Sequence, residues 1–250
     1  IIVRLLVQGD FSINNMDKIT SRSNSKFKNY LKIKENKVDG FILIEGEDLL
    51  NMCLESSFSV KELIVLEYLE EYKEIDQVVL SKELYRELSS YSSLPKLIAV
   101  ASYSLRKPIG NRIVYLDGVQ DPGNFGTIIR TALAFDYYDI VISQNTVSPT
   151  NFKCVQATKG ALFKVNISYG ELEYFEKQGY KLYVTCLDGK DIKDVEKVKE
   201  NFVLVFGNEG KGVSQKTLEL KSEHVLLPIN KAIDSLNVGV AAALFMYLWR

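Results

Sequence analysis

Three polar blocks in the second half of the chain carry side chains that could do chemistry. They are DGVQDPGNFGTIIR at residues 117–130, GNEGKG at residues 207–212 and DSLN at residues 234–237. Glycines in the first two blocks let the backbone approach a ligand closely. The guanidinium of Arg130 can bind a phosphate through two parallel hydrogen bonds, which makes arginine the natural residue for that role.

Apolar runs precede the second and third blocks and predict the elements that position them. Residues 202–206 read FVLVF and residues 224–229 read HVLLPI. A continuous apolar run between turn residues is typical of a strand buried on both faces, as in a parallel sheet. In such sheets, ligands bind at the carboxyl ends of the strands. We therefore expect these two blocks to lie at a ligand-binding edge.

The first block follows a predicted strand at residues 113–116 and is interpreted as a loop that ends at residue 126. A helix predicted at residues 127–135 then places Arg130 in its first turn, where a cation opposes the helix macrodipole. A phosphate bound by both the glycine loop and Arg130 would account for that placement, and we favour it. The alternative is an ion pair of Arg130 with Asp121 or Asp136.

The second and third blocks differ from the common nucleotide-binding motifs. GNEGKG is neither the G-x-x-x-x-G-K-[ST] phosphate loop nor the G-x-G-x-x-G dinucleotide fingerprint. Glu209 is a candidate functional carboxylate, or else a turn residue that stabilises backbone N–H groups. Ser235 or Asn237 can cap the helix predicted at residues 238–250, and capping needs only one of them. This helix is apolar on most sides, which predicts burial or contact with a second subunit.

Composition narrows the class of protein. Hydrophobic residues make up 46% of the chain and charged residues 25%, as in globular proteins, and no apolar run reaches the ~18 residues of a membrane span. The net charge of −1 gives no sign of a nucleic-acid partner. The single histidine, His224, leaves little material for a histidine triad or a zinc site, so no metal is expected. Three separated cysteines indicate a reducing compartment, and we expect a cytoplasmic protein.

One segment near the N-terminus is strongly basic although the whole chain is not. Its basic residues, set against the single acid Glu35, are Lys18, Arg22, Lys26, Lys28, Lys32, Lys34 and Lys37. A serine at position 21, 23 or 25 could cap a helix that begins near Lys26, with Phe27, Tyr30 and Leu31 on one face. The helix contacts phosphates or is only a solvated surface helix, and both interpretations stay open.

Strands and helices alternate in two successive regions. In the first, strands are predicted at residues 41–44, 60–68, 77–80 and 97–101, and helices at residues 45–54 and 82–90. In the second, further strands are predicted at residues 139–142, 161–167 and 181–186, and helices at residues 151–158 and 171–178. This alternation predicts a small α/β domain at residues 17–104, a linker at 105–111 and a second α/β domain at 112–250. Residues 1–16 are interpreted as a leader, disordered or non-native, since Met16 could be the true start.

The three blocks, in this order, resemble the three motifs of the SpoU–TrmH family of SPOUT-class RNA ribose 2′-O-methyltransferases. The matching stretches are LDGVQDPGNFGTIIRT at 116–131, LVFGNEGKGVS at 204–214 and LPINKAIDSLNVGVAA at 227–242. ATKGALFKV at 157–165 also resembles a family segment. The resemblance covers residues 112–250. Residues 17–101 are similar, more loosely, to the RNA-binding domain that many members carry.

The resemblance implies a fold, a cofactor and an assembly. It implies a parallel-sheet domain with a deep trefoil knot that holds S-adenosyl-L-methionine without a metal, and a homodimer formed through that domain. The implied catalytic residues are Asn124, Arg130, Glu209, Ser235 and Asn237. The implied cofactor-binding residues are Gly207, Gly210, Leu227, Ile229, Leu236 and Asn237. The expected RNA contacts are Arg22, Lys26, Lys28 and Arg130.

The resemblance also implies an activity, the transfer of a methyl group to a ribose 2′-hydroxyl, with ribosomal RNA as the expected substrate. Arginine stays protonated in proteins, so we expect Arg130 to anchor phosphate and polarise the hydroxyl, and the base stays open. Asp234 stands where the family usually has Glu, and Gly239 where it usually has Ser. Three alternatives remain: a transfer-RNA methyltransferase, an inactive RNA-binding protein of the same fold, or a nucleotide-dependent α/β enzyme such as a dehydrogenase.

Overall fold

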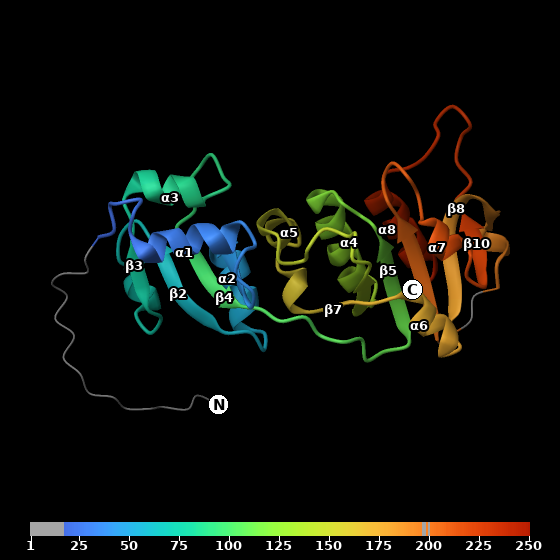
Figure 1. The fold of residues 1–250 in the computed structure, drawn as a ribbon, viewed down its shortest axis with the longest axis horizontal. Helices are drawn as coiled ribbons and strands as arrows, with labels where there is room; N and C mark the ends of the chain where they lie inside the picture. Colours follow the sequence, from blue (N-terminus) through green and yellow to red (C-terminus); the bar gives the residue numbers. More distant parts are fainter. Residues whose placement is uncertain (1–17, 197–198, 200) are drawn as a thin grey trace.

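A computed structural model describes residues 18–196, 199 and 201–250, which form two sheets with helices packed on them (Figure 1). The predicted leader at residues 1–16, with its possible start at Met16, lies outside the described residues. Among those described, none of the helices combines the length and apolarity that a membrane crossing needs.

The smaller sheet is built from the first half of the chain. Its strands are β1 (Phe41–Glu45), β2 (Val60–Val65), β3 (Gln77–Val79) and β4 (Leu97–Ser102). They lie in the order β1-β4-β2-β3, with β4 antiparallel to both of its neighbours and β2 parallel to β3. One face packs against α1 (Ser25–Lys34) and α3 (Lys82–Leu88), and the other against α2 (Glu47–Leu54). This arrangement follows the alternation of side chains along each strand.

The larger sheet is entirely parallel. Its strands are β5 (Arg112–Asp117), β6 (Asp139–Ile142), β7 (Asn166–Tyr169), β8 (Lys181–Asp191), β9 (Phe202–Gly207) and β10 (Ser222–Leu226). They lie in the order β10-β8-β9-β5-β6-β7. Every residue of β9 is buried, as its apolar sequence predicts for a strand covered on both faces. The carboxyl ends of β5 and β9 therefore lie side by side.

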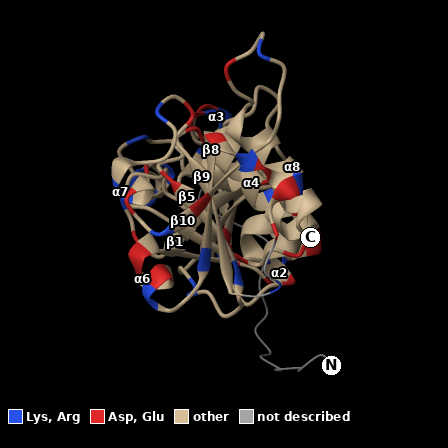
Figure 2. Cartoon of the chain, turned by 90° about the vertical axis from the view of Figure 1, so that its right-hand side faces the viewer, with Lys and Arg blue, Asp and Glu red and all other residues tan. Residues whose placement is uncertain are grey.

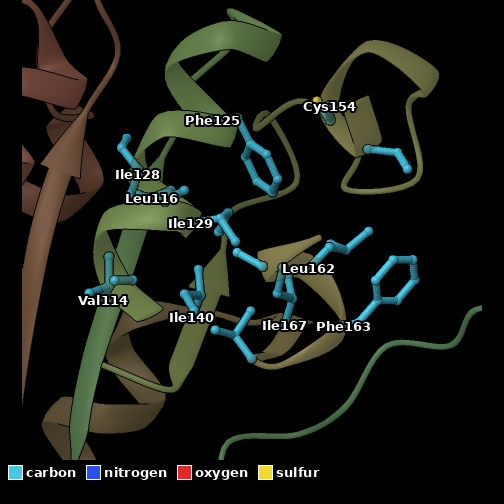
Figure 3. Close-up of a cluster of buried hydrophobic side chains, with 14 of the residues drawn as sticks. Val114, Leu116, Phe125, Ile128, Ile129, Ile140, Cys154, Leu162, Phe163 and Ile167 are labelled. Carbon is cyan, nitrogen blue, oxygen red and sulfur yellow. The ribbon is translucent and has the colours of Figure 1, made fainter. Parts of the chain in front are cut away.

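Helices cover both faces of this sheet. One face packs against α4 (Pro122–Ala134) and α8 (Val238–Leu248), and the other against α6 (Leu172–Lys177). Figure 3 shows Phe125, Ile128 and Ile129 of α4 in a cluster with Val114 and Ile140 of the sheet. The shorter elements are α5 (Phe152–Ala157), α7 (Gln215–Leu218) and the 3₁₀ turns Glu70–Tyr72, Ala161–Phe163 and Ile192–Asp194.

The predicted start of α4 is wrong by five residues, and this changes the interpretation of Arg130. The helix begins at Pro122, because the Asp121 carboxylate caps it by accepting the Asn124 N–H at 2.7 Å and proline is favoured in the first turn. Arg130 therefore lies in the middle of the helix, and the macrodipole argument for it fails. Gly126 lies inside α4, where a Cβ would stand 2.4 Å from the Cβ of Ala157.

Two smaller predictions also need correction, and one element was not predicted. The strand expected at residues 161–167 is a 3₁₀ turn at Ala161–Phe163 followed by β7, which starts only at Asn166. The N-cap of α1 is Asn24 rather than a serine, because the Asn24 side chain accepts the N–H groups of Lys26 and Phe27. The short helix α7 was not predicted.

A buried glutamine joins the two halves of the molecule. Strand β1 is an edge strand of the smaller sheet, so part of its backbone has no strand partner. Gln156 of α5 donates to the carbonyl oxygen of Leu43 at 3.2 Å and accepts from the N–H of Glu45 at 3.3 Å. Nearby, a Cβ on Gly160 would clash with Met52 of α2. The amide of Gln156 thus takes the place of a neighbouring strand, and α5 packs tightly on the smaller sheet.

Candidate active site

Glu209 connects the second block to the first. Its carboxylate accepts the backbone N–H groups of Gln120 at 3.3 Å and Asp121 at 3.1 Å, and the side-chain amide of Asn124 at 3.1 Å. Burial raises the pKa of Glu209. Hydrogen bonds from the Asn124 side chain and from the backbone N–H groups of Glu209 itself, Asp121 and Gln120 together lower the pKa by more, so it lies below the usual value. Glu209 is therefore ionised at neutral pH and acts as an acceptor.

Asn124 and Asn237 connect the first block to the third. The Asn237 amide donates to the Asn124 carbonyl oxygen at 2.8 Å, while the Asn237 carbonyl oxygen caps α8 by accepting the N–H groups of Gly239 and Val240. Asn237 thus serves as cap and as contact at once, and Ser235 is exposed without a hydrogen bond to any described residue. Glu209, Asn124 and Asn237 form one chain of hydrogen bonds, which we call the polar chain.

Asn208 and Asp117 hold the glycine loop in place, and the sequence analysis did not single them out. The Asn208 amide donates to the carbonyl oxygen of Gly118 at 2.8 Å, and its oxygen accepts the N–H groups of Gly210 and Lys211 at 3.0 Å. The Asp117 carboxylate accepts the N–H of Ser214 at 2.7 Å. An asparagine inside a glycine turn is the signal that could have identified Asn208, because its side chain readily bonds the following backbone.

The two glycines predicted to bind cofactor differ in whether a side chain would fit at their positions. A Cβ on Gly207 would lie 2.3 Å from the backbone of Gly212 and Val213, so no side chain fits there. Gly210 is exposed, and a Cβ there would meet only Asn208 Oδ1 at 3.8 Å. The close approach of the backbone at Gly212 and Val213 therefore explains why position 207 is a glycine, whereas the packing around position 210 would accept a side chain.

The remaining predicted cofactor residues lie in the segment between β10 and α8, which stands out from the body of the molecule (Figures 1 and 2). Leu227, Ile229 and Leu236 are half-buried, and Leu227 packs against the main hydrophobic cluster. Their apolar side chains and the polar chain belong to neighbouring loops at the carboxyl edge of the sheet. Such a combination of apolar surface and a few convergent polar groups is typical of a small-molecule site.

Comparison with known proteins identifies the family. The sequence model of the SpoU rRNA Methylase family matches residues 111–247, more than half of the chain. The chain belongs to the SpoU rRNA methylase family. It is 30% identical over 245 residues to the 23S rRNA (guanosine(2553)-2′-O)-methyltransferase RlmP of Bacillus subtilis, covering 93% of this chain and 98% of that protein.

Further relatives agree with this family. The chain is 25% identical over 256 residues to the 23S rRNA (adenosine(1067)-2′-O)-methyltransferase of Streptomyces laurentii, covering 93% of this chain and 95% of that protein. A TrmH-family structure from Porphyromonas gingivalis superposes with a TM-score of 0.79 at 27% identity, over 92% of this chain and 98% of that one. The predicted family and the α/β parallel-sheet fold class are thereby confirmed, and the trefoil knot stays a prediction.

Arg130, the predicted phosphate anchor, is exposed in the middle of α4. It forms no ion pair or hydrogen bond within the described part of the chain, so the alternative pairing with Asp121 or Asp136 is not formed. Asp136 instead accepts the hydroxyl of Tyr138 at 3.0 Å. The guanidinium of Arg130 is thus open to a ligand. The polar chain does not include it, although α4 carries both Asn124 and Arg130.

The predicted RNA contacts on α1 and beside it are partly neutralised. Arg22 pairs with Glu87 at 2.7 Å and Lys26 with Glu62 at 2.5 Å, and both basic side chains are exposed. Lys28 is exposed and has no ion-pair partner among the residues described. Exposed ion pairs contribute little energy and exchange readily, so these pairs leave the phosphate interpretation open.

Gly239 is one of two departures from the usual SpoU pattern. A Cβ there would lie 3.1 Å from Cγ2 of Thr127 and 3.2 Å from Oδ1 of Asn237. The glycine therefore lets the start of α8 approach α4 closely. Asp234, the other departure, is exposed.

One group of described residues could ligate a metal, although the single histidine led to the prediction of none. Cys186, Asp188 and His224 place their ligand atoms within 4.8 Å of one another at the junction of β8 and β10. Burial, followed by the hydrogen bond to Asp188, raises the pKa of the Cys186 thiol to about 11. The thiol is therefore protonated at neutral pH, and a metal would have to displace that proton.

Proposed function

We propose that this protein transfers a methyl group from S-adenosyl-L-methionine to a ribose 2′-hydroxyl of ribosomal RNA. The observation that carries the proposal is the polar chain, which connects the three family blocks through Glu209, Asn124 and Asn237. The ribosomal substrate is proposed because the relatives that match almost the full chain are named as 23S rRNA methyltransferases. An rRNA substrate would place the enzyme in the cytoplasm.

The residues present fit S-adenosyl-L-methionine. Leu227, Ile229 and Leu236 offer apolar surface that could contact an adenine ring, and the close-packed backbone at Gly207 leaves its loop without a side chain at that point. Gly210 and Asn237 complete the proposed cofactor-binding set. The bound sulfonium would supply the electrophilic methyl group.

The protein would mainly position the ribose. Oriented binding can lower the barrier of a reaction of this kind by up to ~7–11 kcal/mol. A general base is expected to raise the rate by ~10²–10⁴-fold, which is the smaller effect. Asn124 and Asn237 would orient the sugar and its loop, with Ser235 as a further contact. Glu209 would hold the loops together by accepting three hydrogen bonds from the first block. Arg130, with a free guanidinium, would anchor the adjacent phosphate and polarise the hydroxyl.

We also propose a division of labour and an assembly. Residues 17–104, joined by a linker at 105–111, would contact RNA through Arg22, Lys26 and Lys28, and residues 112–250 would carry the transferase. A homodimer is supported by α8, whose Val240, Leu244, Tyr247 and Leu248 are 42–49% exposed and share one helical face. Leu244→Asp should convert a dimer into a monomer in light scattering. A monomeric wild-type protein would contradict the assembly.

The function is tested by incubating the purified protein with labelled S-adenosyl-L-methionine and unmodified 23S rRNA transcript. Label in the RNA, located to one 2′-O-methylated nucleotide by primer extension, is the expected result. Binding of the cofactor without transfer to any RNA would favour an inactive RNA-binding protein. Transfer to transfer RNA instead would correct the substrate and keep the chemistry.

A further inference from the structure

A cavity lies between the basic helix α1 and the start of α4. Its volume is about 520 Å³. The lining residues that matter here are Leu31, Lys34, Pro122, Asn151, Phe152 and Lys153. They belong to α1, to the first turn of α4 and to the start of α5, and α5 lies between α1 and α4 in the view of Figure 1. The volume is within the usual range of ~300–1,000 Å³ for sites that bind small molecules or single groups of a larger ligand.

Two lysines, Lys34 and Lys153, bring positive charge to the cavity. Two acids also line it, but Glu87 is paired with Arg22 at 2.7 Å and Glu35 with Lys37 at 2.6 Å. Arg22 and Lys37 lie outside the lining. Lys34 still interacts electrostatically with Glu45 and Glu87, so Lys153 is the lining lysine that no carboxylate of a described residue compensates.

The two lysines differ in their surroundings. Lys34 Nζ donates to the carbonyl oxygen of Glu87 at 2.7 Å and lies 5.4 Å from the ring centre of Phe152. Lys153 is exposed and has no ion-pair partner in the described part of the chain. Neither lysine forms an ion pair with a described residue, so the two ammonium groups at the rim of the cavity can attract an anion, and a phosphate could accept hydrogen bonds from both.

The remaining walls fit a nucleobase. Leu31, Phe152 and Pro122 supply apolar surface. The Asn151 oxygen accepts the N–H of Lys153 at 2.9 Å, while its NH₂ group has no partner among the described residues and could donate to a base edge. Unpaired RNA bases are bound in this way, between apolar or aromatic surfaces and a few hydrogen-bonding groups.

The position of the cavity relates it to the candidate active site. Pro122 is two residues before Asn124, about 3 Å along the helix axis. The preceding residue, Asp121, donates its N–H to Glu209. The cavity and the polar chain therefore adjoin the same turn of α4, and one RNA strand could reach both.

We propose that this cavity binds an unpaired nucleotide that flanks the nucleotide to be methylated. Its phosphate contacts Lys34 and Lys153, and its base packs between Leu31, Phe152 and Pro122. This inference rests on the proposed function and assigns it a second, non-reacting contact with single-stranded RNA. It places the specificity for the flanking nucleotide at the junction of α1 and α5.

The test uses Lys153→Glu in the full-length protein, with Lys177→Glu as the matched control. Lys177 is also an exposed lysine and lies on α6, outside the cavity, so the change in net charge is identical. With unmodified 23S rRNA transcript, Lys153→Glu should raise KM for RNA at least about tenfold, with kcat and cofactor affinity unchanged. The slope of the logarithm of the RNA-binding constant against the logarithm of salt concentration should become less negative by about 0.7 per lost phosphate contact. Lys153→Glu kinetics equal to those of the control would overturn the inference.

Ultraviolet crosslinking of wild-type protein to the same transcript gives an independent readout. Crosslinked peptides should include residues 31–34 or 151–153. Crosslinks confined to other segments, or none, in a protein that methylates the transcript would refute the cavity and leave the methyltransferase function standing. Wild-type protein that methylates no RNA at all would instead refute the proposed function.

Discussion

Replacing Glu209 by glutamine separates an orienting role from a chemical one. The carboxylate uses one oxygen for the Asp121 N–H and the Asn124 amide, both at 3.1 Å, and the other for the Gln120 N–H at 3.3 Å. Glutamine has the same shape but only one acceptor oxygen. It can keep the first two bonds, while its NH₂ group would face the N–H of Gln120. The substitution therefore costs one hydrogen bond and the charge on the other two.

The magnitude follows from typical hydrogen-bond energies. A bond to a charged group contributes ~1.5–3 kcal/mol and a neutral one ~0.5–1.5 kcal/mol. Two bonds that each weaken by ~1 kcal/mol and one lost bond of ~1.5 kcal/mol give about 3.5 kcal/mol for a dry site. Glu209 is exposed, so water replaces part of the loss, and we expect about 1–2 kcal/mol. That range corresponds to a fall of about 5–30-fold in kcat/KM.

The assay is methyl transfer to 23S rRNA transcript under kcat/KM conditions, with thermal unfolding measured in parallel. Glu219→Gln is the control, because Glu219 is exposed and accepts only the Gln215 side chain at 3.3 Å. Less than a twofold change in Glu209→Gln would refute the claim that the polar chain orders the loops. A fall beyond about a thousandfold would also refute it, since Glu209 would then take part in the chemistry itself.

Three further outcomes are expected. Arg130→Ala should lower turnover by about a hundredfold or more while the melting temperature and cofactor affinity stay unchanged, because Arg130 is exposed and unpaired among the described residues. Gly207→Ala should destabilise the fold by more than about 2 kcal/mol in chemical denaturation, since its Cβ would lie 2.3 Å from the Gly212 backbone. The lowered pKa of Glu209 means that its contribution to folding stability is present above about pH 4.3 and is lost as pH falls through the lower folded-state value; chemical denaturation over that interval should follow this loss.

Local sequence signals predicted most strands and the identity of the blocks. The apolar runs at 113–116 and 202–206 became β5 and β9 because continuous apolar sequence leaves a strand no solvent-facing side. The start of α4 was misplaced because Gly123 and Gly126 were interpreted as loop glycines. The Asp-Pro pair at 121–122 carried the better signal, a capping side chain followed by a residue suited to the first turn.

Strand order could not be predicted from the sequence, and the site depends on it. Periodicity describes each strand alone, whereas the position of β9 between β8 and β5 follows from contacts between distant residues. The same limit applied to Asn124, which was identified by resemblance but whose two partners, Glu209 and Asn237, lie 85 and 113 residues away. Lys153 was missed altogether, because a single lysine in a short helix carries no pattern.

The amide of Gln156 binds α5 to the edge of β1, and α5 in turn packs closely against α4 at Ala157 and Gly126. A tethered RNA-binding module would let its transferase sample many nucleotides around the docking point. If RNA binds α1 and Arg130 as proposed, the sugar that reaches Arg130 would lie at a set distance from the nucleotides bound by α1. An exchange of the N-terminal half would therefore have to preserve the backbone positions of Leu43 and Glu45 that bind Gln156. Otherwise a different nucleotide would be expected to reach the active site.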